Sequence, residues 1–341
     1  MQNQIQSLTG LRGLAALIVF VSHGANQGVL PRVFGNGFGQ IGVMLFFVLS
    51  GFLMAHLYLY QEASRKTLSS FVLARVGRVF PLYLALILTS YLIIASGLKP
   101  DFHYRVDSVL TLSESLLFLR APNEFWTIPV EVQFYALFLI LWITFARKPT
   151  GSVVPIVSLW VASAIPSAAY WLYNGGVLPL VTTYATPFML GLLLAGLFRT
   201  AQESEPQLRW SNRLGLLFLL AVLLNLPSLR LDYGLTLGEG FYLRTWLDPL
   251  NWALVLGLFY CAMLSARSLN FLSGALMAYF GGISYALYLF HYPVLIAVSE
   301  TALPTVLKFP IAFLIVVGLA HLSGRYLEVP AAKFVRRFGK R

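Results

Sequence analysis

The amino-acid sequence predicts an all-α polytopic membrane protein, and three observations lead to that prediction. Of its 341 residues, 58% are hydrophobic and only 11% are charged, whereas soluble domains carry about 25% charged residues. The apolar residues gather in segments of roughly 20, the length that crosses a bilayer as a helix. The chain has one cysteine, Cys261, so neither an internal disulfide nor a cysteine cage for a metal is expected.

Hydropathy along the chain predicts about ten membrane-spanning helices in one bundle. We place them at 8–25, 38–60, 71–96, 126–146, 151–173, 179–198, 213–230, 246–265, 278–299 and 303–327. No signal-peptide cleavage pattern precedes the first segment, so we expect that helix to be retained as the insertion signal. Because no tandem repeat or low-complexity tract is found, residues 1–341 are expected to form a single membrane domain without an appended soluble domain.

The positions of the charged residues predict that both termini are cytoplasmic. With the N-terminus inside, most of the 24 lysines and arginines fall in inner segments, while acidic residues gather in the outer connections. The net charge of +11 therefore indicates cytoplasmic loops and a basic tail near anionic lipid, and no nucleic-acid partner is expected. The two longest polar connections, 97–125 and 231–245, fall outside, where they rest on the membrane surface or cover a site.

The first segment, LTGLRGLAALIVFVSH, carries two ionisable side chains, Arg12 and His23. The separation of eleven positions makes about three helical turns, so both side chains share one face, roughly 16 Å apart. Ionisable groups within a membrane are costly and face a protein interior or a wet cavity. Two interpretations remain open. Arg12 binds lipid phosphate while His23 caps the outer end, or both side chains line a functional route.

The next two segments carry close-packing glycines and a basic pair. Gly42 and Gly51 in the second segment predict that neighbouring helices approach closely. Arg75 and Arg78 lie three residues apart, on one face at the cytoplasmic end of the third segment. They are either ordinary flanking charges or a fork for a polyphosphate ligand.

The fourth segment opens FWTIPVEVQFYALF. Trp126 is typical of an interfacial anchor, and Pro129 suits the first turn of a helix. Glu131 lies within about two turns of that end, with Tyr135 beside it, and an unpartnered carboxylate there would be costly. His23 is expected at a similar depth. A His23–Glu131 pair would be either a base with its orienting group or a structural hydrogen bond.

The last two segments add a histidine and an acidic residue. His291 falls at mid-to-outer membrane depth within GGISYALYLFHYPVL. Glu328 falls near the inner face, where we expect it to pair with Arg325 or Lys333. The histidines are too scattered for a ligand set and no HExxH motif occurs, so no metal site is expected.

Together these stretches resemble the acyltransferase-3 family of bacterial integral-membrane O-acyltransferases, over essentially the whole chain. The matching stretches, in order, are LRGLAALIVFVSH, GVMLFFVLSGFL, ARVGRVFPLY, FWTIPVEVQFY, GGISYALYLFHYPVL and LEVP. The resemblance implies a ten-helix bundle in the bacterial cytoplasmic (inner) membrane. Such glycan O-acetyltransferases move an acyl group, usually acetyl from acetyl-CoA, to a carbohydrate hydroxyl on the far side. It implies no permanently bound cofactor.

The family's motifs map onto residues singled out above. They are Arg12 and His23 for the Arg-x10-His signature, Arg75 and Arg78 for the basic pair, Trp126, Thr127 and Glu131 for the fourth-segment motif, and His291 for the late histidine. Two positions depart from the family pattern. Met44 and Val132 stand where the family commonly carries an aspartate and a second glutamate, which leaves Glu131 as the main carboxylate.

We hypothesise the following roles for these residues. Arg12, Arg75 and Arg78 would bind the phosphates of acetyl-CoA, and His23 would act as general base or as transient acyl carrier. Glu131 would orient the imidazole and stabilise its cation. Contacts to the oxyanion or to the acceptor would come from Ser22, Tyr135, His291 and Trp126. Two other classes stay open, a non-catalytic assembly factor and a secondary transporter of a small solute or glycan, although we detect no inverted repeat.

Overall fold

The structure, a computed structural model, describes residues 2–147, 157–158, 160–162, 165, 181–201, 205–231, 245–246 and 248–338. These residues form helices and connections and contain no strand. Most of the predicted helix at 151–173 and most of the 231–245 connection lie outside the described residues. The chain divides into two compact units, Met1–Ser50 with Leu194–Ala320 (unit 1) and Gly51–Leu193 with His321–Arg341 (unit 2).

Several helices are long and apolar enough to cross a membrane. Among the described residues they are Gln6–Asn26, Arg32–Leu59, Arg65–Ala95, Asn123–Thr144, Ala275–Ser299 and Thr305–Phe338. The helices Pro249–Met263 and Arg267–Ser273 meet at an 80° bend and make one further span if they are counted together. The expectation of an all-α polytopic membrane protein is confirmed at this level. The count of ten and the cytoplasmic termini stay predictions.

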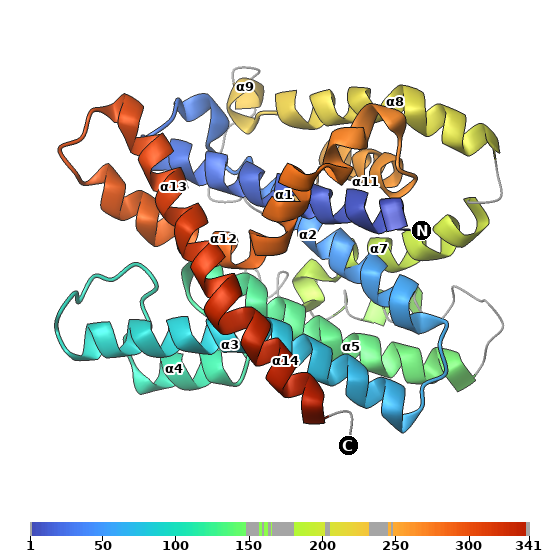
Figure 1. Ribbon diagram of the computed structural model, residues 1–341, viewed down its shortest axis with the longest axis horizontal. Helices are drawn as coiled ribbons and strands as arrows, with labels where there is room; N and C mark the ends of the chain where they lie inside the picture. Colours follow the sequence, from blue (N-terminus) through green and yellow to red (C-terminus); the bar gives the residue numbers. More distant parts are fainter. Residues whose placement is uncertain are drawn as a thin grey trace. The chain divides into compact units, whose positions relative to one another are not determined.

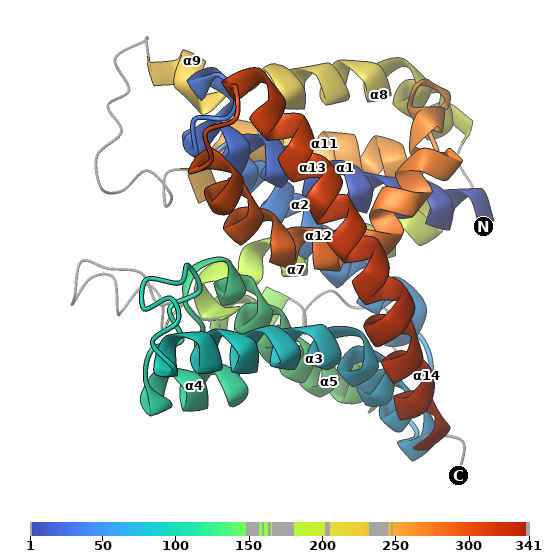
Figure 2. The same ribbon diagram turned by 60° about the vertical axis from the view of Figure 1, so that its left-hand side comes forward.

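Unit 1 is built around a pair of adjacent helices, α1 and α12 (Figures 1 and 2). Its helices are α1 (Gln2–Asn26), the first part of α2 (Gly39–Met54), α8 (Glu205–Leu224), α9 (Pro227–Leu231), α11 (Pro249–Met263), α12 (Ala275–Ser299) and most of α13 (Thr305–Ser323). Figure 1 also shows α8 running alongside α11. The 3-10 turn Arg267–Ser273 packs against α1.

Glycines bring α1 and α12 into backbone contact. A Cβ atom added at Gly281 would lie 2.0 Å from the carbonyl oxygen of Thr9, and one added at Gly13 would lie 2.9 Å from the Gly281 nitrogen. His23 meets His291 ten residues beyond this contact on each helix. The two helices therefore run in the same direction, and their close approach positions the two histidines.

Unit 2 contains the helices that carry the predicted basic pair and acidic residue. They are α3 (Arg65–Ala95), α4 (Val109–Leu116), α5 (Thr127–Arg147), part of α7 (Val181–Ala201) and α14 (Val329–Phe338). Serine side chains cap two of these helices, Ser64 accepting from the Thr67 N–H and Ser108 from the Thr111 N–H. The predicted close approach at Gly51 is confirmed, since a Cβ there would lie 2.0 Å from the Phe188 carbonyl oxygen.

Two predicted helix boundaries were wrong, each for a local reason, and one predicted connection contains helical segments. The helix predicted at 213–230 breaks at Asn225 and Leu226, because Pro227 lacks an N–H and restricts the residue before it. The connection at 97–125 contains α4 and the 3-10 turn Asn123–Trp126. The helix predicted to end at 327 continues through a π-helical turn into α14, which is too basic for a hydropathy scan to find.

Candidate active site

Two histidines, one from α1 and one from α12, form the centre of the candidate site in unit 1. His23 Nδ1 lies 2.6 Å from His291 Nε2. The ring planes are within 9° of parallel and the ring centroids are 4.9 Å apart. Atoms of stacked rings stay about 3.5 Å apart or more, so the shorter nitrogen–nitrogen distance means that the rings lie edge to edge. They share a hydrogen bond in nearly one plane.

Aromatic and amide groups fix both rings. The Tyr292 ring meets the His23 ring edge-on, with centroids 4.8 Å apart and planes at 81°. Gln27 Nε2 donates to the Tyr292 hydroxyl at 2.8 Å. On the other side, His291 Nδ1 is hydrogen-bonded to the backbone carbonyl of Tyr288. His291 is fully buried and His23 half-buried, so the pair sits at the edge of the core with one ring accessible.

Ser22, the residue before His23 in α1, carries a buried hydroxyl. It is fully buried, and among the described residues its Oγ has no hydrogen-bond partner. A buried polar group left unsatisfied costs about 1–3 kcal/mol. Gly39 of α2 packs over it, since a Cβ there would lie 3.3 Å from Ser22 Oγ. A ligand oxygen is one partner that would satisfy this hydroxyl.

Arg12 lies on the same uninterrupted helix as His23, because α1 runs from Gln2 to Asn26 without a break. Continuous α-helix is the condition for the predicted shared face, and the structure meets it. The Arg12 side chain is half-buried. Its ligand stays a prediction.

Arg75 is the centre of a second cluster, which lies in unit 2. Its guanidinium carbon is 5.6 Å from the centre of the Phe71 ring and 5.5 Å from that of Tyr135. A cation over an aromatic ring gains about 0.5–2 kcal/mol. The Tyr135 hydroxyl donates to Glu131 Oε1 at 2.5 Å, and the Glu131 carboxylate interacts electrostatically with Arg75. Arg75 Nε is buried and has no hydrogen-bond partner among the described residues, so the aromatic faces hold a guanidinium that keeps one unused donor.

Arg78 belongs to a neighbouring part of unit 2. It interacts electrostatically with Glu328, whose Oε1 accepts a hydrogen bond from Ser323 Oγ at 2.9 Å. Glu328 lies in the π-helical turn Gly324–Glu328, a type of turn that is frequent at functional sites. Sequence neighbours suggested pairing with Arg325 or Lys333, whereas the fold brings Arg78 from another helix.

The other predicted positions fall at well-packed places. The Trp126 ring lies against Tyr184, with centroids 4.6 Å apart, just before α5 begins. Met44 is fully buried in α2, so an aspartate at that position would be desolvated, whereas Val132 is half-buried. His23 and Glu131 belong to different units, and their expected pairing stays a prediction.

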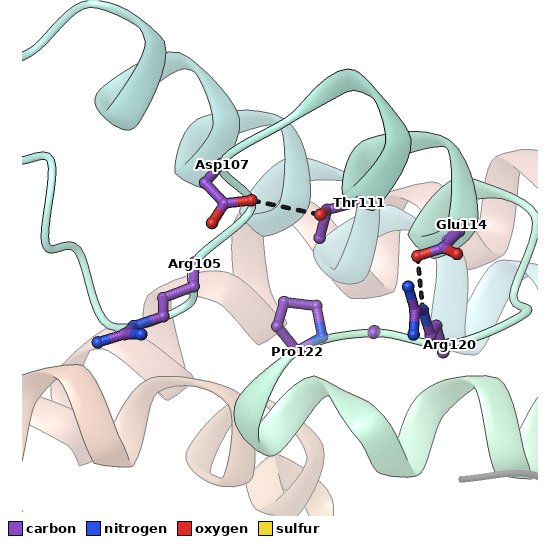
Figure 3. A pocket seen from close by; sticks show the side chains of 7 residues that line it. Arg105, Asp107, Thr111, Glu114, Arg120 and Pro122 are labelled. Atoms are coloured by element: carbon purple, nitrogen blue, oxygen red, sulfur yellow. Dashed lines mark hydrogen bonds and ion pairs between the residues drawn. The ribbon is translucent and has the colours of Figure 1, made fainter. Parts of the chain in front are cut away.

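The connection between α3 and α5 holds a pocket of about 270 Å³ (Figure 3). It is lined by Arg105, Asp107, Thr111, Glu114, Arg120, Ala121 and Pro122. Arg120 Nε donates to Glu114 Oε2 at 2.6 Å, and this carboxylate raises the pKa of the Arg120 guanidinium. Asp107 accepts a hydrogen bond from Thr111 at 3.3 Å, and Figure 3 shows the Arg105 guanidinium pointing away from these pairs.

The sequence did not reveal a His–Glu hydrogen bond in the same connection. His103 is hydrogen-bonded to Glu124, and Asn123 Nδ2 donates to the His103 carbonyl. The backbone of Arg105, Phe118 and Asn123 has positive φ angles of 44°, 54° and 47°, which residues other than glycine seldom adopt. The segment is therefore held by specific contacts. No periodicity or motif links residues 103 and 124, so the sequence carried no signal for this pair.

Comparison with known proteins identifies the family. The profile of an acyltransferase domain, acyltransferase 3, matches residues 5–324. The chain belongs to the acyltransferase-3 family. The acyltransferase MdmB of Streptomyces mycarofaciens is 31% identical over 49% of this chain and 45% of its own length. The peptidoglycan O-acetyltransferase OatA of Listeria monocytogenes is 25% identical over 96% of this chain and 56% of its own.

The chain spans about half the length of these curated relatives. No solved structure matches it. The resemblance to this family is confirmed, and each of the mapped motif residues lies within the matched range. With its long apolar helices, the chain is an integral membrane protein of an acyltransferase family.

Proposed function

We propose that the protein is a membrane O-acyltransferase that moves an acetyl group from cytoplasmic acetyl-CoA to a hydroxyl of a cell-surface or lipid-linked carbohydrate. Membership of the family and the peptidoglycan O-acetyltransferase among its relatives support this reaction class. The single observation that carries the proposal is the hydrogen-bonded pair His23–His291. A thioester is already activated, so transfer needs chiefly a base for the acceptor hydroxyl and donors for the oxyanion.

In the proposed reaction, His23 removes the proton of the acceptor hydroxyl as its oxygen attacks the thioester carbonyl. The tetrahedral oxyanion then collapses, the carbon–sulfur bond breaks, and the proton on His23 passes to the departing CoA thiolate. Ser22 is our candidate oxyanion donor, because its buried hydroxyl lacks a partner among the described residues. Attack by His23 itself, with an acyl-imidazole intermediate, is the alternative route.

The donor would enter past the basic residues. Arg75 and Arg78, with Arg12, are proposed to bind the phosphates of acetyl-CoA, for which a guanidinium offers paired, planar donors. The support is the Arg75 side chain, whose guanidinium lies over two aromatic rings and has a buried Nε without a partner among the described residues. Glu131 is proposed to balance the positive charge that develops on His23. We propose that the protein lies in the bacterial inner membrane and that its basic side faces the cytoplasm.

The acceptor side is proposed to involve the connection at 97–125. Its pocket presents carboxylate, guanidinium and hydroxyl groups, which suit the hydroxyls of a carbohydrate (Figure 3). Tyr135 and Trp126 are the remaining candidates for acceptor contacts.

The test is transfer of label by the purified full chain in lipid nanodiscs. The protein is incubated with acetyl-CoA labelled in the acetyl group, with peptidoglycan fragments or a neutral oligosaccharide as acceptor, beside empty nanodiscs as control. We expect an acceptor that carries one base-labile acetyl ester. Label that stays on CoA with every acceptor, together with uptake of an intact solute in proteoliposomes, would replace the enzyme with a transporter.

A further inference from the structure

We infer that His291 is a positioning residue for His23. It holds a proton on His23 Nδ1 and so leaves the lone pair on Nε2, the nitrogen that takes the acceptor's proton. This inference deepens the proposed function and rests on it for the role of Nε2. The proton arrangement itself follows from the contacts of the two rings.

The Tyr288 carbonyl determines which atom donates in each of the two hydrogen bonds. A carbonyl oxygen only accepts, so His291 Nδ1, which is hydrogen-bonded to it, must carry a proton. A neutral imidazole carries one N–H, and His291 Nε2 is then an acceptor. A doubly protonated His291 would place a charge on a ring that is 0% exposed, which is costly.

The second bond follows from the first. His291 Nε2 lies 2.6 Å from His23 Nδ1, and because Nε2 accepts, Nδ1 must donate. The neutral His23 ring therefore carries its proton on Nδ1 and its lone pair on Nε2. The nearly coplanar rings give this bond good geometry, since the acceptor lone pair lies in the ring plane.

Packing holds the His23 ring in the orientation that presents Nδ1 to His291. The edge-on Tyr292 ring, whose hydroxyl accepts from Gln27, restricts rotation of the His23 ring. Backbone contact at Gly13 and Gly281 fixes the spacing of the two helices. In hydrolytic triads, a carboxylate accepts the Nδ1 proton of the catalytic histidine. Here the neutral imidazole of His291 accepts this proton, whereas the sequence analysis gave the orienting role to Glu131.

The direct test is the tautomer of His23 in the full chain. The protein has five histidines, so selective ¹⁵N-histidine labelling in nanodiscs gives few signals, and loss of one set in His23→Asn assigns it. We expect a protonated Nδ1 and an unprotonated Nε2 for His23. In His291→Met we expect the two tautomers of His23 to mix. A proton found on Nε2 in the unmodified protein would overturn the inference, whatever the activity.

A kinetic test separates positioning from support of the fold. His291→Gln offers an amide oxygen as acceptor, whereas His291→Met fills similar space without a strong acceptor. We expect His291→Met to lower kcat by about 10²–10³-fold, in the range of general-base effects, with little change in KM for acetyl-CoA. His291→Gln should recover much of that loss at equal thermal stability. Equal losses of kcat in two folded variants would contradict the positioning role.

If wild-type protein shows the expected tautomer but transfers no acetyl group, the proposed function fails while the proton arrangement stands. If transfer occurs and the tautomer is the opposite one, the positioning role fails and the proposed function stands.

Discussion

The histidine pair of unit 1 and the arginine cluster of unit 2 are held by different kinds of contact. His23 and His291 meet because two helix backbones touch at glycines. Their spacing therefore depends on backbone atoms, which cannot adjust by changing rotamer. Arg75 is held by the faces of Phe71 and Tyr135, which are side chains that can adjust. We therefore expect the histidine pair to respond to steric changes and the arginine cluster to respond to changes in charge.

The largest effect should come from adding one methyl group at the α1–α12 contact. In Gly281→Ala the new Cβ would lie 2.0 Å from the Thr9 carbonyl oxygen, which belongs to the backbone and has no other rotamer. Overpacking of this kind costs about 1–3 kcal/mol or more. We expect a lower melting temperature and loss of acetyl transfer.

Gly282→Ala is the matched control, because a Cβ at Gly282 has nothing within 4 Å among the described residues. It should leave transfer intact, and alanine should favour the helix slightly over glycine. Similar damage in both variants would mean that the backbone contact does not position the pair.

The next largest effect is expected from substitutions in the arginine cluster, and it should appear in donor binding. Arg75→Gln removes the charge proposed to bind donor phosphate, and we expect KM for acetyl-CoA to rise about tenfold or more, with a smaller change in kcat. Arg75→Lys should recover part of the affinity because it restores charge but not the fork. Arg65→Gln, an exposed change in the same helix, is the control. Unchanged donor binding in Arg75→Gln would remove the phosphate role.

A substitution at Tyr135 tests the role of its hydroxyl separately from that of its ring. Tyr135→Phe keeps the face under Arg75 but removes the 2.5 Å hydrogen bond to Glu131. We expect a loss of about 1–2 kcal/mol in unfolding free energy and little change in KM for acetyl-CoA. A larger rise in KM than in Arg75→Gln would show that the hydroxyl, and not the guanidinium, governs donor binding.

The smallest effect belongs to the exposed ion pair in the pocket of Figure 3. Arg120→Gln should leave the melting temperature unchanged, since ion pairs in water contribute little. If the pocket contacts the acceptor, KM for the carbohydrate should rise a few-fold while KM for acetyl-CoA stays constant. A change confined to the donor KM would place the pocket on the other substrate.

Much of this arrangement was predictable from local pattern. Hydropathy found the long helices, the eleven-residue spacing placed Arg12 and His23 on one continuous helix, and Gly42 and Gly51 predicted close packing. These features depend on residues near one another in the chain. Pro227 carried an equally local signal, which a hydropathy window averages away.

The partners of the ionisable groups were not predictable in the same way. His23 and His291 are 268 residues apart, and only helix packing brings them together. The glycines at 13 and 281 signal close approach but not which helix approaches. Depth in the membrane suggested Glu131 as a partner of His23, and that pairing stays a prediction, because depth ranks residues along one axis only. Lateral order of the helices decides the partner.

The central claim is that His23, paired with His291, is the base of an acetyl transfer. The most direct measurement is the rate of transfer from acetyl-CoA by His23→Asn, with donor binding measured on the same samples. We predict a rate lower by about 10²–10⁴-fold with acetyl-CoA binding unchanged. Transfer at the unmodified rate by a folded His23→Asn protein would contradict the account.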